Sequence, residues 1–395
     1  MNGGRMPKKE RMRFVSAEQV AQLAGVSRSA VSRTFTPGAS VAPATREKVL
    51  RAAEELGYHV NDLARGVLAN QSRLVGIVAT RPEVGFRAHL AAALAKSLIR
   101  RGSIPILVNT GQTEEELLAA QKMLIGHRAE AIIILSGSPP ASFLELAQRN
   151  GQPLVVIGRS EPDADHVRAG NSEASRRAAT AFYESGRRRL AVIGSNSGTP
   201  AIVERESAFL SAAESLGASV MVARGDDSDY QGGVTAGRAL FTEKIKPDAV
   251  FCANDLIAFG LMDIARQEAR LRLPEDLAVI GFDDVPESAW LSYQLTTFRQ
   301  DPLVMAQRAV ALMERRLENP DAPPGFRTRH SGTRHPAELQ AIIPPPTFRR
   351  RHPVARKEKC DPIGRKIVGD EGNSPARRAS RHFDRDRVPG AERQA

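Results

Sequence analysis

The sequence is poor in cysteine and contains no long apolar run. Cys252 and Cys360 are the only cysteines among 395 residues, which excludes a disulfide framework and a cysteine-based zinc site. Cys252 lies in an apolar stretch and is expected to be a small core residue. No apolar segment approaches the ~20 residues of a membrane helix. The basic start, MNGGRMPKKERMRF, is not followed by a signal-peptide core. We therefore expect a cytoplasmic protein without a membrane segment.

Motifs of catalysis are also missing. The chain has neither a GxxxxGK[ST] nor a GxGxxG phosphate loop. GSNSG (194–198) has Asn196 where a nucleophile elbow needs serine. The eight histidines show no metal-ligand spacing. Asp283 and Asp284 could form a catalytic pair, but neighbouring side chains at a strand end point apart. No enzymatic activity, cofactor or metal is expected.

Positive charge is concentrated at the two ends of the chain. The net charge is +11, and residues 1–72 have 11 Lys and Arg against 6 Asp and Glu. Residues 321–395 have 17 against 9, while the middle is nearly neutral. A basic N-terminal region suits phosphate binding. At this length the chain can bury more than one core.

The N-terminal region begins with a signal for a helix. Ser16 and Gln19 have the spacing of a capping box, in which each side chain bonds the other residue's backbone amide. Val20, Leu23 and Ala24 share one face of that helix and are expected to be its buried stripe.

A second helix should follow a tight turn at Gly25. Ser27 can cap this helix, and Val31 and Phe35, four residues apart, should face inward. The opposite face carries a polar stripe of Arg28, Ser29, Ser32 and Arg33. Such a stripe near a helix N-terminus is what a helix in the major groove of DNA uses. Taken on spacing alone, a small amphipathic helical pair with a solvated polar face remains an alternative.

Three successive segments resemble the DNA-binding head of LacI/GalR-type bacterial transcription regulators. They are AEQVAQLAGVSRSAVSRTF, TREKVLRAAEELGY and NDLARGVLANQS. The resemblance implies a helix-turn-helix domain over 15–60, after a basic N-terminus over 1–14. It further implies that Arg28, Ser29 and Arg33 contact DNA bases. Phosphate binding or helix capping is implied for Ser16, Ser27, Ser32 and Asn61.

The resemblance also implies a hinge helix and linker over 61–72, which forms in the minor groove when two chains meet on DNA. Val67 stands where the family has a leucine wedge, with Leu68 beside it, and apolar wedges of either type can unstack a base step. Ala42 stands where the family usually has a capping serine. Loss of a cap costs roughly 1 kcal/mol, which predicts a looser third helix.

Short apolar runs alternate with helical patterns from Leu74 onward. Runs rich in valine and isoleucine are typical of strands buried on both faces of a parallel sheet. Repeated strand–helix units predict an α/β fold with helices on both faces of each sheet. The expected strands are 74–79, 104–109, 131–135, 154–158, 190–194, 220–223, 249–253 and 277–282, and the expected helices are 90–101, 114–124, 172–185, 205–216, 232–241 and 256–268.

The resemblance to the LacI/GalR family continues to about Glu318 through ANDLIAFG, LPEDLAVIGFDD and LTTFRQD. It implies a periplasmic-binding-protein-like (type I) effector and dimerisation domain over 73–320. Its two lobes would be 73–160 with 296–320, and 165–292. A small ligand would bind between them, at the carboxyl ends of strands.

Five residues are candidates for effector binding. By resemblance, Asn254 and Asp283 hydrogen-bond ligand hydroxyls, whereas Asp255 caps the helix that follows. Arg205 matches the family's ligand-contacting arginine. Phe86 either stacks on the ligand or packs the loop after the first strand.

Arg159 is the fifth candidate, because sugar-responsive relatives often have aspartate at that point. Gly170-Asn171 likewise replaces a common Asp-Asn pair. Loss of a carboxylate and gain of a guanidinium favour an anionic ligand, a sugar acid or phosphosugar, over a neutral polyol.

Composition changes after Pro320. Residues 321–395 are rich in arginine and proline and lose apolar periodicity, which predicts disorder over most of this tail. Residues 336–343 are the one weak candidate for a strand that completes the second lobe. The tail is either an accidental extension of the reading frame, which we favour, or a basic arm for DNA.

Taken together, the sequence predicts a repressor that binds a pseudo-palindromic double-stranded operator as a homodimer or as a dimer of dimers. A sugar-like or anionic effector would switch it, and it would act on the nucleoid. A solute-binding transport protein would share the two-lobed fold but lack the head. A sugar-directed enzyme would need a catalytic constellation that the sequence does not offer.

Overall fold

A computed structural model describes residues 14–36, 38–60, 72–111, 113–135, 141–159 and 164–329. The hinge residues Asn61, Val67 and Leu68 and the weak strand candidate at 336–343 lie outside these ranges. Within the described part of the chain, no helix is both long and apolar enough to cross a lipid bilayer.

The N-terminal head consists of three helices, α1 (Ala17–Ala24), α2 (Arg28–Thr34) and α3 (Pro43–Leu56). The capping box of Ser16 and Gln19 is present. Gly25 adopts the left-handed conformation (φ 65°) that lets the chain turn, and Ser27 caps α2. Ala42 makes no side-chain cap at the start of α3. The predicted caps of α1 and α2 and the turn at Gly25 are confirmed.

The head core is built around the fully buried Val20, Val31 and Val49, with Phe35 packed against it. The prediction that Leu23 belongs to the buried stripe is wrong, because its side chain is 47% exposed. Ala21 is buried instead, so α1 turns a neighbouring face toward the core.

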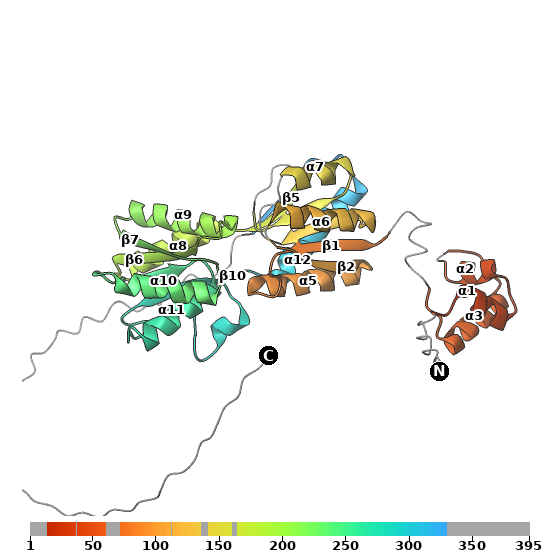
Figure 1. The fold of residues 1–395 in the computed structure, drawn as a ribbon, viewed down its shortest axis with the longest axis horizontal. Coiled ribbons are helices and arrows are strands. Elements are labelled where there is room, and N and C mark those ends of the chain that lie inside the picture. Colours follow the sequence, from red (N-terminus) through yellow and green to blue (C-terminus); the bar gives the residue numbers. More distant parts are fainter. Residues whose placement is uncertain are drawn as a thin grey trace, which may run out of the picture. The chain divides into compact units, whose positions relative to one another are not determined.

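Two parallel sheets follow (Figure 1). The first has the strand order β11-β5-β4-β3-β1-β2 and the second β10-β9-β8-β6-β7. The strands are β1 (Leu74–Ala79), β2 (Ile104–Asn109), β3 (Ala131–Leu135), β4 (Leu154–Ile157), β5 (Asp165–Ala169), β6 (Arg189–Ser195), β7 (Ser219–Gly225), β8 (Ala249–Cys252), β9 (Ala278–Asp283), β10 (Thr296–Arg299) and β11 (Phe326–Arg329).

Helices cover both faces of each sheet, as the alternating pattern predicted (Figure 1). They are α5 (Phe86–Arg101), α6 (Glu114–Gly126), α7 (Ala141–Arg149), α8 (Asn171–Glu184), α9 (Pro200–Ser215), α10 (Tyr230–Thr242), α11 (Asp255–Gln267) and α12 (Pro302–Glu318), with a 3-10 turn at Pro286–Ala289. Alternate residues of β1 serve opposite faces, since Val75 packs with α5 and α12 while Val78 packs with α6 and α7. Cys252 is fully buried in the second lobe, as expected.

The predicted assignment of residues to the two lobes is wrong at three strands, none of which the sequence predicted. β5 was placed in the second lobe but pairs with β4 in the first sheet. β10 was placed in the first lobe but pairs with β9 in the second sheet. β11 lies beyond Pro320, in the predicted tail, and completes the first sheet rather than the second lobe. The edge strands β2 and β7 are only partly buried, contrary to the prediction for both.

A buried carboxylate holds the last strand in place. Asp165 at the start of β5 accepts a hydrogen bond from the Arg316 Nε at 3.0 Å and another from the Gly325 amide at 2.5 Å. Arg316 also donates to the Pro320 carbonyl. The turn after α12 is thus fixed by charge-assisted bonds in a buried place, which local sequence patterns do not reveal.

Helices α10 and α11 approach so closely that glycine is required at their contact. A Cβ on Gly260 would overlap the Tyr230 carbonyl oxygen and lie 2.7 Å from the Val234 amide nitrogen. Both obstacles are backbone atoms, which cannot rotate away.

Gly260→Ala should therefore lower the free energy of unfolding by about 3 kcal/mol, the upper range for overpacking. Gly126→Ala is the matched control, since nothing lies within 4 Å of its would-be Cβ at the end of α6. It should be neutral or stabilise by up to about 1 kcal/mol. Urea unfolding measures both, and equal values for the two variants would contradict the proposed close contact.

Candidate nucleic-acid interface and ligand cavity

Helix α2 presents an exposed polar face. Its exposed side chains are Arg28, Ser29, Ser32 and Arg33, preceded by the exposed N-cap Ser27. On the opposite side Val31 and Thr34 are buried. The structure therefore separates the polar stripe from the core-facing residues, as the sequence predicted for a helix that reads a groove.

Two of the predicted serines already have intramolecular partners. Ser16 accepts the Gln19 amide, and Ser27 accepts the Ala30 amide at 3.2 Å and bonds the Ser29 hydroxyl at 2.9 Å. The end of α2 is fixed by Arg46 of α3, which donates to the Thr34 carbonyl at 3.1 Å. These contacts hold α2 rigidly on the head while Arg28 and Arg33 project from it.

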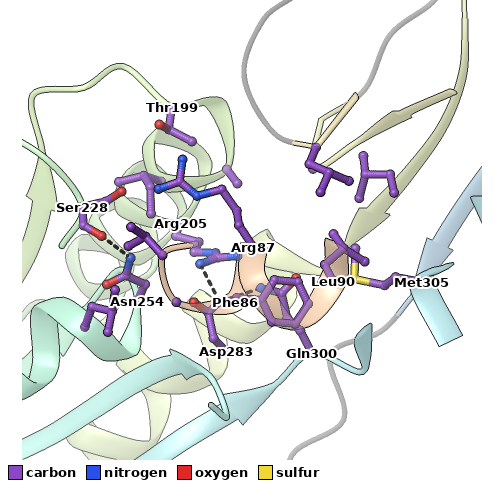
Figure 2. A pocket seen from close by; sticks show the side chains of 18 residues that line it. Phe86, Arg87, Leu90, Thr199, Arg205, Ser228, Asn254, Asp283, Gln300 and Met305 are labelled. Carbon is purple, nitrogen blue, oxygen red and sulfur yellow. Dashed lines mark hydrogen bonds and ion pairs between the residues drawn. The ribbon is translucent and has the colours of Figure 1, made fainter. Parts of the chain in front are cut away.

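The second candidate site is a cavity between the two lobes, the interlobe cavity (Figure 2). It lies where strands β1, β4, β8 and β9 end, as parallel α/β sheets predict. Its lining comes from both lobes and includes Phe86, Arg87, Leu90, Leu135, Ile157, Thr199, Ile202, Arg205, Ser228, Asn254, Asp283, Gln300 and Met305.

Arg205 is the polar centre of this cavity. Its side chain is 4% exposed. It donates to the Asn171 Oδ1 at 2.9 Å and to the Ala253 carbonyl at 2.7 Å, and its NH1 lies 3.4 Å from the Asp283 Oδ1. The guanidinium also lies over the Phe282 ring, 3.5 Å from its centroid. Burial lowers the pKa of Arg205, and the nearby Asp283 charge opposes that shift.

Asp283 joins Arg205 to the end of β10. It accepts a hydrogen bond from Gln300 at 2.6 Å (Figure 2). Burial raises the pKa of Asp283, while Arg205 acts in the opposite direction. Asp283 has a positive φ of 134°, which turns the chain sharply after β9. Both predicted residues therefore lie at the cavity, but each is already hydrogen-bonded to other protein groups, Arg205 to Asn171 and the Ala253 carbonyl and Asp283 to Gln300.

Asn254, and not Asp255, caps helix α11. Asn254 is the N-cap of α11, because its Oδ1 accepts the Ile257 amide at 2.9 Å. Its Nδ2 donates to the Ser228 carbonyl at 2.7 Å, and the residue still lines the cavity. The prediction that Asp255 is the cap is wrong. Asp255 is fully buried and accepts bonds from the Val285 amide and the Thr297 hydroxyl.

The first lobe contributes a residue that the sequence analysis missed. Phe86 lines the cavity and also packs against the cores of both lobes, and it begins α5 rather than lying in a loop. Arg87, the next residue, also lines it. Arg159, the predicted ligand arginine, is not among the lining residues, whereas its neighbour Gly158 is. The sequence after β1 mixes apolar and charged residues and does not indicate that Arg87 lines the cavity.

An ion-pair cluster crosses from one lobe to the other beside the cavity. Arg81, in the loop after β1, pairs with Asp227 at 2.5 Å and with Asp229 at 3.2 Å. Asp229 also caps α10 of the second lobe. Because Arg81 is 39% exposed, the pairing contributes modestly to stability. It nevertheless joins the two lobes through charges that salt can screen.

The fold and the two sites define a class of protein, a helix-turn-helix head followed in the chain by a two-lobed α/β binding domain. Residues 18–61 match the model of the bacterial regulatory proteins of the lacI family, and residues 179–334 match a periplasmic binding protein-like domain. The chain belongs to the LacI family of bacterial regulatory proteins.

Similar proteins are transcription regulators. The regulator CelR of Thermobifida fusca is 30% identical over 327 residues, which cover 80% of this chain and 95% of CelR. The repressor PurR of Vibrio atlanticus is 29% identical, covering 78% of this chain and 93% of PurR. Among solved structures, the Lac repressor dimer bound to operator and an anti-inducer aligns with a TM-score of 0.73 at 22% identity, covering 80% of this chain and 97% of that one.

A CelR–cellobiose complex is also similar, with a TM-score of 0.59 at 29% identity, covering 80% of this chain and all of that one. This protein is accordingly a DNA-binding transcriptional regulator rather than an enzyme. Within the described ranges, no group of three or more His, Cys, Asp or Glu side chains is arranged to hold a metal ion.

The buried Asp255 predicts a pH dependence of stability. Burial, reinforced by the charge of Asp283, raises the pKa of Asp255 from its ordinary 3.8 to about 8. A folded-state pKa above the unfolded value means that the folded protein binds the extra proton. The associated stability is complete below about pH 4 and is lost as the pH rises through about 8.

Asp255→Asn, which imitates the protonated acid, should therefore flatten the fall in the free energy of unfolding between pH 6 and 9. Asp276→Asn is the control, because the Arg272 hydrogen bond lowers the pKa of Asp276 below its ordinary 3.8, so Asp276 stays ionised throughout this window. Chemical unfolding at several pH values gives the slopes. A wild-type slope retained in Asp255→Asn would show that Asp255 is ionised in the folded protein.

Proposed function

We propose that this protein is a repressor that binds a pseudo-palindromic operator as a homodimer and is switched by a sugar-like effector in the interlobe cavity. One observation carries the proposal. The same chain has an exposed, donor-rich face on α2 and a cavity whose polar groups come from both lobes. A ligand that contacts both lobes can change the position of one lobe relative to the other. Such a change can switch a regulator that binds the chromosome in the cytoplasm.

On DNA, we place α2 in the major groove. Arg28 and Arg33 supply guanidinium forks that suit the two acceptors of guanine, while Ser29 and Ser32 suit bases or phosphates. Their exposure on a helix fixed to the head supports this assignment. Phosphate contacts would give much of the affinity and make it sensitive to salt.

The homodimer is supported by exposed apolar side chains on both lobes. Ile99 and Leu107 are exposed on the first lobe, and Trp290 and Leu291 are 56% and 90% exposed on the second. Exposed apolar surface of this kind can be buried against a second copy of the chain. A dimer also supplies the second head that a palindromic site requires, since one helix reads only a few base pairs.

The effector is proposed to be a sugar or sugar derivative. The related CelR forms a complex with cellobiose, and another relative is a ribose operon repressor of Escherichia coli. The cavity combines apolar walls with hydrogen-bonding groups such as Ser228, Asn254 and Gln300, the mixture that sugar binding needs. Effector and operator would be coupled by about 1–3 kcal/mol, as is typical of allosteric proteins.

Arg33→Ala tests the DNA-binding assignment. Loss of a bidentate base contact should weaken binding to the operator at least tenfold, since such a contact is worth about 1–3 kcal/mol of discrimination. Binding to unrelated DNA should change little. Fluorescence anisotropy with the promoter of the protein's own gene, compared with scrambled DNA, measures both.

Arg51→Ala is the matched control. It removes one exposed head arginine from α3, where Arg51 pairs with Glu47, and leaves α2 intact. It should reduce affinity for both DNAs slightly and equally. If Arg33→Ala discriminated operator from scrambled DNA as well as the wild type does, its assigned role would be refuted.

A further inference from the structure

The charged residues that line the interlobe cavity do not balance. They are Arg87, Arg205 and Asp283. Arg205 and Asp283 form an ion pair with each other. The lining therefore carries one further positive charge, and it is on Arg87.

Arg87 has a single hydrogen bond among the described residues, from its NH1 to the Thr80 carbonyl at 2.9 Å. No ion pair within 4.0 Å involves it in the described part of the chain. Asp227, the carboxylate whose charge affects Arg87 most, already pairs with Arg81. Desolvation lowers the pKa of Arg87, as expected for a cation whose lost hydration is not replaced by a counter-ion.

The surroundings of Arg87 also favour negative charge. Figure 2 shows its side chain extending from α5 toward the side of the cavity that carries Thr199 and Ser228. Thr199 begins α9 without a side-chain cap to the first turn, and Ala201 of that turn lines the cavity. Pro200 has no N–H and the Ile202 amide bonds the Thr199 carbonyl, so the start of α9 offers an anion the positive end of the helix dipole.

We infer that the effector carries a carboxylate or phosphate group and that Arg87 binds it, which makes Arg87 the residue that selects anionic effectors over neutral ones. The inference rests on the proposed function of the cavity and names the chemical class of its ligand. A guanidinium fork matches either oxyanion with two parallel hydrogen bonds.

A neutral sugar would fit this site poorly. It would displace water from Arg87 and leave the guanidinium buried without a counter-charge, which is unfavourable. The two groups of charged residues in the cavity therefore have different roles. The Arg205–Asp283 pair offers a neutral, hydrogen-bonding wall for hydroxyl groups, while Arg87 provides the charge.

The assignment differs from the one that the sequence suggested. Arg159 and Arg87 both lie in the first lobe, but only Arg87 lines the cavity. Substitution of each arginine separately by glutamine therefore decides between the two positions.

Isothermal titration with matched ligands tests the inference. The wild type is titrated with glucose, gluconate and glucose 6-phosphate, and with ribose, ribonate and ribose 5-phosphate. At least one anionic member should bind at least tenfold more tightly than its neutral parent. Arg87→Gln should weaken that anion about ten- to a hundredfold, Arg87→Lys should keep part of the preference, and Arg159→Gln should have no effect.

Arg100→Gln, an exposed position on the same helix, controls for the loss of one charge. The inference is overturned if neutral sugars bind as tightly as their acids and esters, or if Arg87→Gln leaves the anion affinity unchanged. Release of operator DNA by a neutral sugar alone would overturn it while the proposed function stands. Failure of the wild type to bind any promoter DNA specifically would refute the proposed function, whereas the anion preference would be judged by titration alone.

Discussion

The buried guanidinium of Arg205 is the interaction on which the effector domain depends. A buried charge is tolerated only when paired and hydrogen-bonded, and Arg205 meets that condition through Asn171, the Ala253 carbonyl and Asp283. Asn171 is the first residue of α8, Ala253 directly follows β8, and Asp283 is the last residue of β9. One side chain thus fixes the strand ends that form the second lobe's side of the cavity.

Two consequences follow from that arrangement. Asp283 is hydrogen-bonded to Arg205 and Gln300, and it acts on Arg87 through space without forming an ion pair with it among the described residues. The cavity is left with net positive charge on the first lobe's side. The cluster of Arg81 with Asp227 and Asp229 then joins the lobes beside it. Charge therefore has two roles: on the proposed function it selects the ligand, and it links the two lobes beside the cavity.

Local chemistry made much of the fold predictable. Serine caps, Gly25 and the apolar runs of β1 and β3 depend on neighbouring residues, so the sequence located them correctly. β5 was missed because DHVRA has no apolar run, and its place is set by pairing with β4 and β11. Asn254 and Asp255 are equally good caps, and only the tertiary contact with Thr297 decides between them. Arg87 could not be separated from Arg159 because side-chain direction depends on packing.

On the proposed function, ligand in the interlobe cavity and operator DNA on α2 are energetically linked. Linkage requires that each changes the affinity of the other by the same factor. The direct measurement is operator affinity with and without saturating ligand, paired with ligand affinity with and without saturating operator. The two factors are expected to be equal, at about 5- to 150-fold. A ligand that binds the cavity, with Arg87→Gln weakening it, and yet leaves operator affinity unchanged would contradict the account.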